Sequence, residues 1–288
     1  MRLSPLAPAL LAASALVLAG CAPTDAGSGG DTGAPVPVAI ITSETGPLAA
    51  YGAAYLNGFK AGLDYATDGT GTVDGRELDI TYLDDAGDPD KAVTLAKDVI
   101  GNGTQIIAGT ASSGIALALA EQAAQNEILY ISGPAAADAI TGVNEYTFRS
   151  GRQTYQDVAT AGTFIGNPSG KTVTVFAQDT AFGQGNVAGV EAVLGAKGAT
   201  VTSVLVPEDA TEFTPFAQQV LTSGADLVFV AWAGATSGAM WQALSQQGVF
   251  EAMPVVTGLG DVSTYGAYGA ASEDISFLSH YFGGAAGT

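Results

Sequence analysis

The sequence is poor in histidine, cysteine and positive charge. Its 288 residues include one histidine, one cysteine, and nine lysines and arginines against 28 acidic residues, which gives a formal net charge of -19. So acidic a chain is poorly suited to nucleic acid or to anionic lipid surfaces, and neither is expected as a partner. His280 stands alone, and the chain has no Gly-x-Ser-x-Gly elbow, zinc-ligand cluster or dinucleotide-binding glycine motif. The sequence therefore predicts no catalytic residues, no metal site and no cofactor.

The only cysteine follows a short apolar run. Residues 6–18 are largely apolar, but a membrane-spanning helix needs about 20 such residues, so the run indicates a signal peptide. Ala19 and Gly20 lie directly before Cys21, a pattern that resembles the bacterial lipobox. We expect a signal peptide over residues 1–20, a lipid on Cys21, and a protein anchored at the extracytoplasmic face of the cell membrane. Ordinary secretory cleavage near Ala22 is the alternative.

Behind Cys21 the composition changes. Residues 21–35 are rich in Gly, Ser, Thr, Pro and Asp without apolar periodicity, which is typical of a flexible tether. From residue 36, short apolar runs alternate with stretches of helical period, and this alternation predicts parallel sheets covered by helices on both faces. Strands are expected at residues 38–42, 78–83, 105–108, 128–132, 172–177, 200–206, 226–232 and 254–257. Helices are expected at residues 50–66, 90–100, 114–126, 155–165, 183–194, 214–221 and 237–246.

One break in the alternation divides the chain. Between residues 134 and 154 a short strand at 146–148 takes the place of a regular helix, so we expect one lobe over residues 36–150 and a second over residues 151–281. The predicted fold class is α/β, with two doubly wound lobes of parallel sheet joined by a hinge. Ligands of such sheets bind beyond the carboxyl ends of the strands. The cleft between the lobes is therefore the expected binding site.

Two serines mark the end of one strand and the start of a helix. Ser112 and Ser113 follow the apolar residues Ile107 and Ala108 and precede the helix expected from Gly114. The unpaired N–H groups and partial positive charge of a helix N-terminus suit a ligand carboxylate, and a serine hydroxyl adds a donor. A serine that only caps its own helix is the alternative interpretation.

An acidic run, residues 84–90, invites comparison with calcium loops. An EF-hand loop needs a glutamate at its twelfth position, where this chain has Leu95 or Ala96. The run is better explained by Asp88 as the cap of the helix that begins after Pro89.

Several short segments, in order, resemble the branched-chain amino-acid binding protein family of type I periplasmic binding proteins. The resemblance covers essentially residues 36–281. It is carried by Val38-Ala39-Ile40-Ile41, Thr45-Gly46-Pro47-Leu48-Ala49-Ala50-Tyr51-Gly52, Asp84-Asp85-Ala86-Gly87-Asp88-Pro89, residues 109–113, residues 131–136 with Thr141, Phe148-Arg149, Gln178-Asp179 and Phe182-Gly183. It implies a lipoprotein that captures amino acids, amides or aromatic acids and delivers them to the permease and ATPase subunits of an ABC importer.

The resemblance also implies ligand-binding residues. Tyr51 would line the cleft, Ser113 beside Ser112 would donate to the ligand carboxylate, and Pro134, Ala135 and Ala136 would contribute backbone groups. From the second lobe Phe182, Trp232 with Ala233, and Gly260 with Asp261 would face the ligand.

The chain also departs from the family pattern. Ala136, Ala233 and Gly260 stand where branched-chain amino-acid binders carry a threonine, a tyrosine and a glutamate, so an aromatic or otherwise less polar carboxylate fits better. Arg152, near the hinge, is expected to pair with a ligand acid or with Asp157. Family members continue past residue 281, so residues 282–288 are expected to begin a missing return segment. A ligand sensor with a signalling partner and an exported α/β hydrolase are the alternative functions.

Overall fold

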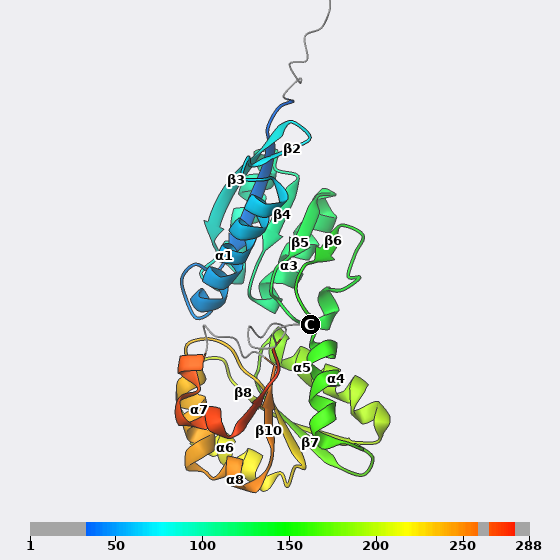
Figure 1. The fold of residues 1–288 in the computed structure, drawn as a ribbon, viewed down its shortest axis with the longest axis vertical. Coiled ribbons are helices and arrows are strands. Elements are labelled where there is room, and N and C mark those ends of the chain that lie inside the picture. The colour runs from blue at the N-terminus through cyan, green and yellow to red at the C-terminus, as the bar shows by residue number, and fades with distance from the viewer. Residues whose placement is uncertain (1–32, 259–264, 280–288) are drawn as a thin grey trace, which may run out of the picture.

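The fold consists of two lobes, each built around its own sheet (Figure 1). The computed structural model describes residues 33–258 and 265–279. The signal peptide, Cys21, residues 21–32 of the tether, Gly260, Asp261, His280 and residues 282–288 lie outside this part of the chain. No helix within the described ranges is long and apolar enough to cross a membrane.

The first lobe holds a six-stranded sheet in the order β2-β3-β1-β4-β5-β6. All neighbours pair in parallel except β2 and β3, which form an antiparallel hairpin. Helix α1 lies on one face, and α2 and α3 lie on the other. The strands are β1 (Val36–Thr42), β2 (Thr72–Val73), β3 (Arg76–Asp84), β4 (Ile106–Gly109), β5 (Leu129–Ser132) and β6 (Thr147–Arg149), and the helices are α1 (Ala49–Ala66), α2 (Pro89–Gly101), α3 (Ser113–Asn126) and the 3-10 turn η1 (Asp138–Ile140).

Strand β1 shows why this sheet is covered on both faces. Val38 and Ile40 pack into the cluster under α1, whereas Ala39 and Ile41 pack against α2 and α3. Successive side chains of a strand point to opposite faces, so an uninterrupted apolar run fits a strand buried on both sides.

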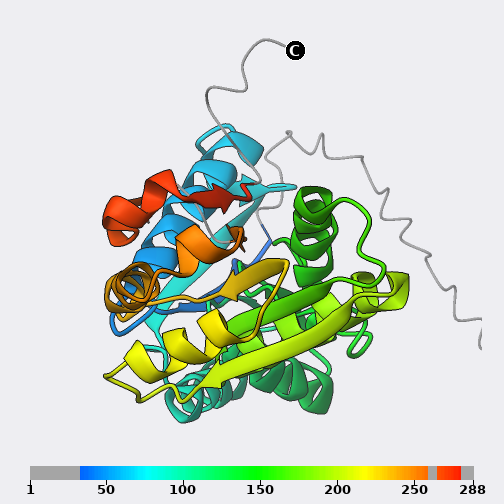
Figure 2. The same ribbon diagram turned by 90° about the horizontal axis from the view of Figure 1, so that it is seen from below.

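The second lobe holds a five-stranded, fully parallel sheet in the order β11-β10-β9-β7-β8. Helices α4 and α5 cover one face and α6, α7 and α8 the other, as the view from below shows (Figure 2). The strands are β7 (Thr172–Gln178), β8 (Thr200–Val206), β9 (Leu227–Ala231), β10 (Val255–Thr257) and β11 (Ile275–Phe277). The helices are α4 (Thr154–Ile165), α5 (Ala181–Val193), α6 (Thr214–Thr222), α7 (Ser237–Gln246) and α8 (Val249–Ala252), with 3-10 turns η2 (Gly195–Lys197), η3 (Tyr265–Ala267) and η4 (Gly269–Glu273).

The predicted fold class is confirmed, and every expected strand and helix is present with ends within two residues of those expected. Asp88 caps α2 as predicted, because its Oδ1 accepts from the N–H groups of Asp90 and Lys91 at 2.9 and 3.2 Å. The sequence did not indicate β2, β11 or α8. The first sheet ends at Arg149 and α4 begins at Thr154, so the change of sheet falls in residues 150–153.

The parallel strands of each lobe end at the edge that faces the other lobe (Figure 1). In the first lobe, β1, β4 and β5 lead into residues 43–48, 110–113 and 133–137, and in the second lobe β7 and β9 lead into residues 179–180 and 232–236. This arrangement places loops from both lobes around one space, as the doubly wound architecture requires.

Candidate functional site

A cavity of about 690 Å³ lies between the lobes. This volume is within the range of roughly 300–1,000 Å³ typical of small-molecule sites. The first lobe and the hinge contribute Pro47, Leu48, Tyr51, Ala54, Tyr55, Gly87, Pro89, Ala111, Ser112, Ser113, Gly114, Pro134, Ala136, Ser150, Gly151 and Arg152. The second lobe contributes Gln178, Thr180, Ala181, Phe182, Glu208, Ala233, Ala235, Thr236 and Gly258.

The N-terminus of α3 forms one part of the cavity wall. Ser112 Oγ accepts from the Ile115 N–H at 3.4 Å, and Ser113 Oγ accepts from the Ala137 N–H at 3.2 Å. Each hydroxyl is therefore used as an acceptor and keeps its own hydrogen as a donor. The first N–H groups of a helix have no partner within it, and those of Ser113 and Gly114 make no hydrogen bond in the described part of the chain. Four donors thus gather where the helix dipole favours negative charge.

A buried carboxylate holds the loops that carry this wall. Asp85 is fully buried and accepts from Ser43 Oγ at 2.6 Å, Thr110 Oγ1 at 2.5 Å and the Gly87 N–H at 2.8 Å. Its partners come from the loops after β1, β3 and β4. Asp85 therefore ties together the segments that present Pro47, Gly87 and Ser112 to the cavity.

The neighbouring carboxylate of Asp84 fixes the start of the loop after β1. Asp84 Oδ1 accepts from the N–H groups of Glu44, Thr45 and Ala86 at 2.9 to 3.1 Å, and Oδ2 accepts from Thr45 Oγ1 at 2.6 Å. Burial by itself would raise the pKa of Asp84, but the Thr45 hydroxyl and the three N–H groups outweigh it and hold the pKa well below its usual range.

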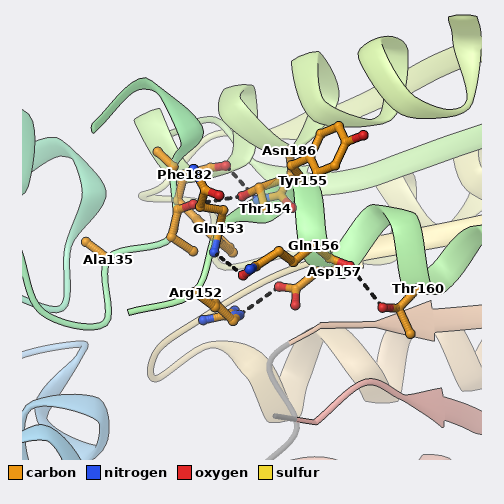
Figure 3. Close-up of polar contacts among 12 residues, drawn as sticks. Ala135, Arg152, Gln153, Thr154, Tyr155, Gln156, Asp157, Thr160, Phe182 and Asn186 are labelled. Atoms are coloured by element: carbon orange, nitrogen blue, oxygen red, sulfur yellow. Dashed lines mark hydrogen bonds and ion pairs between the residues drawn. The ribbon is translucent and has the colours of Figure 1, made fainter. Parts of the chain in front are cut away.

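The hinge side of the cavity carries an ion pair. Arg152 Nε donates to Asp157 Oδ2 at 2.7 Å across the first turn of α4 (Figure 3). The two side chains are only 12% and 6% exposed. The structure thus shows the pairing with Asp157 that the sequence allowed. Arg152 Nη2 is buried and has no hydrogen-bond partner among the described residues.

The predicted binding residues are distributed unevenly. Tyr51, Ser112, Ser113, Pro134, Ala136 and Phe182 line the cavity. Ala135 does not, because it packs in the core beneath α3 and its carbonyl accepts from Arg149 Nη2 at 2.9 Å. Asp261 lies outside the described residues.

Trp232 lies in a different position from the one expected. It packs among Phe176 and Phe213 in the core of the second lobe, with ring centroids at 5.3 and 5.4 Å, and its Nε1 donates to Thr236 Oγ1 at 3.0 Å. Trp232 lines a smaller pocket of about 190 Å³, together with Trp241 and, from the first lobe, Pro47 and Tyr51.

The sequence did not single out three further lining residues. Tyr55 follows Tyr51 by one turn of α1, and burial raises the pKa of its hydroxyl to about 12. Gln178 ends β7 and accepts from the Ala233 N–H at 3.1 Å through Oε1, and Glu208 follows β8 and is exposed. The sequence offered two signals for these residues. Tyr55 lies one helical turn after Tyr51, and Gln178 and Glu208 lie at or just after the end of a strand.

Comparison with known proteins gives a consistent result. The model of the periplasmic binding protein family matches residues 35–288. A Leu/Ile/Val-binding protein of Rhizobium johnstonii, BraC3, is 28% identical over 200 residues, which cover 68% of this chain and 54% of that protein. The chain spans about half the length of the curated relatives it matches, 54% and 59% in two of them and 43% in others.

Solved structures share the fold. An ABC-type branched-chain amino acid transporter protein of Rhodopseudomonas palustris is 34% identical with a TM-score of 0.57, and the match covers 78% of this chain and 62% of that one. A solute binding protein of an ABC transporter from the same species, in complex with 3,4-dihydroxybenzoic acid, is 26% identical with a TM-score of 0.66, covering 77% and 61%.

Proposed function

The chain belongs to the periplasmic binding protein family, and from that premise we propose that it is an extracytoplasmic solute-binding protein that holds a small carboxylic acid between its lobes. It delivers this solute to the permease and ATPase subunits of an importer in the same membrane. A lipid on Cys21 keeps it there. Incorporation of labelled palmitate tests for the lipid anchor, and the label is expected to be absent from Cys21→Ser.

The proposal rests mainly on the hydrogen-bond donors that gather at the N-terminus of α3. The hydroxyls of Ser112 and Ser113 and the N–H groups of Ser113 and Gly114 offer donors to one oxygen-rich group. A carboxylate matches both these donors and the positive end of the helix dipole. A hydrogen bond to a charged group is worth about 1.5–3 kcal/mol, so this site can supply much of the binding energy.

The rest of the wall favours an apolar or aromatic body on the acid. Tyr51, Tyr55 and Phe182 are the aromatic residues among the described lining residues, and Leu48, Pro134 and several alanines complete the apolar surface. Aromatic rings bury large apolar areas and stack on one another. Two similar proteins bear names that mention branched-chain amino acids and 3,4-dihydroxybenzoic acid, and both kinds of solute combine a carboxyl group with such a body.

Isothermal titration of branched aliphatic and aromatic acids tests the proposal. Ser113→Ala removes one donor to the carboxylate, and the dissociation constant is expected to rise about tenfold. Ser169→Ala is the matched control, because Ser169 is exposed in the turn before β7, at the opposite edge of the sheet. If no acid binds, or if Ser113→Ala binds as tightly as the parent, the proposed site is wrong.

A transport protein and a sensor would both hold the solute in this cavity, so ligand binding alone does not distinguish them. Stimulation of importer ATPase activity by the liganded protein supports transport, whereas binding to a signalling protein alone supports a sensor. An enzyme would alter its ligand, so recovery of the bound acid unchanged after prolonged incubation excludes the exported hydrolase.

A further inference from the structure

The smaller pocket, of about 190 Å³, adjoins the main cavity and is built from both lobes. Pro47, Tyr51 and Ala235 line both spaces, so the pocket and the cavity meet at these three residues. Ala50 of the first lobe and Trp241 of the second line the pocket alone. A solute held in the cavity can therefore extend into the pocket past this shared boundary.

The pocket and the N-terminus of α3 lie on opposite sides of the two sheets. In the first lobe Ala50 and Tyr51 belong to α1, which covers one face of the sheet, whereas α3 covers the other. In the second lobe Trp241 belongs to α7, on the face opposite α5. Figure 1 shows α1 and α7 at one side of the molecule and α3 and α5 toward the other. The far end of a solute anchored at α3 is therefore the part that would fill the pocket.

Aromatic packing holds the walls of the pocket in place. The ring centroids of Trp241 and Tyr268 are 5.4 Å apart, and Tyr268 also meets Phe277 edge-on at 4.7 Å. Trp232, Trp241 and Tyr268 are 2–6% exposed, so each of these rings is part of the core of the second lobe. Closely packed walls relax only partially around an empty space, and the pocket is therefore ready for an occupant.

The pocket favours an apolar occupant. Trp232 Nε1 donates to Thr236 Oγ1 at 3.0 Å, and Ser237 Oγ donates to the Gly234 carbonyl at 2.8 Å. Both hydrogens are thus used within the second lobe and are not available to a solute oxygen. Apolar cavities of about 150 Å³ hold a benzene molecule. A pocket of about 190 Å³ therefore admits a ring or a branched alkyl group of similar size.

We propose that this pocket is a second subsite, which binds the apolar end group of a longer carboxylic acid. The carboxylate is held at the N-terminus of α3, a chain crosses between the lobes, and the end group lies between α1 and α7. This inference rests on the proposed function, because it assumes that the carboxylate occupies α3. It narrows the solute class to acids whose carboxyl group is separated from a ring or branched end by several carbon atoms.

A series of ω-phenylalkanoates, from phenylacetate to 6-phenylhexanoate, tests the inference by titration calorimetry. Phenylacetate is the shortest member and serves as the reference for an acid held in the main cavity alone. Each additional buried methylene is expected to tighten binding about fourfold, and entry of the ring into the aromatic pocket adds to this. One longer member is therefore expected to bind at least about tenfold more tightly than phenylacetate.

Two variants fill the pocket from opposite lobes. Ala50 and Ala267 are exposed, and both line the pocket but not the main cavity. In Ala50→Leu and in Ala267→Leu the gain of the longer acid over phenylacetate is expected to fall to about one, while phenylacetate binds as it does to the parent. Ala53→Leu is the matched control, because Ala53 is exposed on α1 and lines neither space, and it is expected to keep the gain.

The outcomes separate this inference from the proposed function. If no acid binds the parent, the proposed function fails and this inference with it. If acids bind and weaken in Ser113→Ala, but the longer acids gain nothing or keep their gain in both leucine variants, the inference alone is overturned. An equal loss of affinity for phenylacetate and for the longer acids in the leucine variants would assign the effect to lobe closure and would overturn the inference as well.

Discussion

Asp85→Asn is expected to destabilise the first lobe more than any comparable surface change. The substitution preserves the shape of the side chain but replaces one carboxylate oxygen with an NH2 group. Asp85 Oδ2 accepts from the Thr110 hydroxyl, and Oδ1 accepts from Ser43 Oγ and the Gly87 N–H. An asparagine can keep the contacts made by Oδ1. Its NH2 group, however, takes the place of Oδ2, which accepts from the Thr110 hydroxyl, so two hydrogen-bond donors then face each other.

The magnitude follows from these three bonds. Hydrogen bonds to a charged group contribute about 1.5–3 kcal/mol, and neutral ones about 0.5–1.5 kcal/mol. Two bonds lose their charge assistance and the third must rearrange, so the free energy of unfolding is expected to fall by about 2–4 kcal/mol. Gly87 lines the cavity, and Ser43 and Thr110 lie in loops that carry other lining residues, so affinity for the acid should fall as well.

Urea unfolding followed by far-UV circular dichroism measures the effect. Asp79→Asn is the matched control, because Asp79 lies on strand β3, which ends directly before Asp85, is exposed and makes no side-chain hydrogen bond in the described structure. It is expected to change stability by less than about 0.5 kcal/mol. An Asp85→Asn protein as stable as the control would mean that removing the cost of burying the charge balances the lost bonds, and the reasoning would be refuted.

Two more predictions concern the loop after β1 and the helix that follows it. The carboxylate of Asp84 has a pKa held below the unfolded value of about 3.9, so its contribution to stability is complete above that value and is lost as the pH falls below it. The stability difference between the parent and Asp84→Asn, from urea unfolding at a series of pH values, should therefore be constant near neutral pH and shrink below about pH 4; a difference that persists unchanged to pH 2 would contradict this. Gly52→Ala places a Cβ 1.8 Å from the Ser43 carbonyl oxygen and is expected to destabilise by about 1–3 kcal/mol or more. Gly58→Ala on the same helix meets no atom within 4 Å and should stabilise slightly, so equal melting temperatures for these two variants would refute the packing argument.

Local patterns were sufficient to predict most of the fold. The apolar run at residues 200–206 and the helical spacing at residues 237–246 predicted β8 and α7 with the bounds found. Strand β11 was missed because Ile275–Phe277 is only three residues long and is a strand through its pairing with β10. Helix α8 is a single turn, too short to show a period.

Site residues could be predicted from the sequence where the neighbouring residues of the chain determine their position. Ser112 and Ser113 lie between a strand and a helix, and Arg152 reaches Asp157 within a few residues, so sequence alone placed both features. Trp232 could not be placed this way, because its orientation depends on Phe176 and Phe213 from other elements. Glu208 lines the cavity only because β8 ends beside the other strands of its sheet.

The arrangement of the tryptophans gives the molecule a built-in optical reporter. The chain has two, Trp232 and Trp241, both in the second lobe, and both contact the small pocket whose opposite wall is Pro47 and Tyr51 of the first lobe. Indole emission therefore comes from one lobe, while its surroundings include the other. Any separation of the lobes exchanges first-lobe side chains for water beside these rings, so intrinsic fluorescence can follow lobe movement in the unlabelled protein.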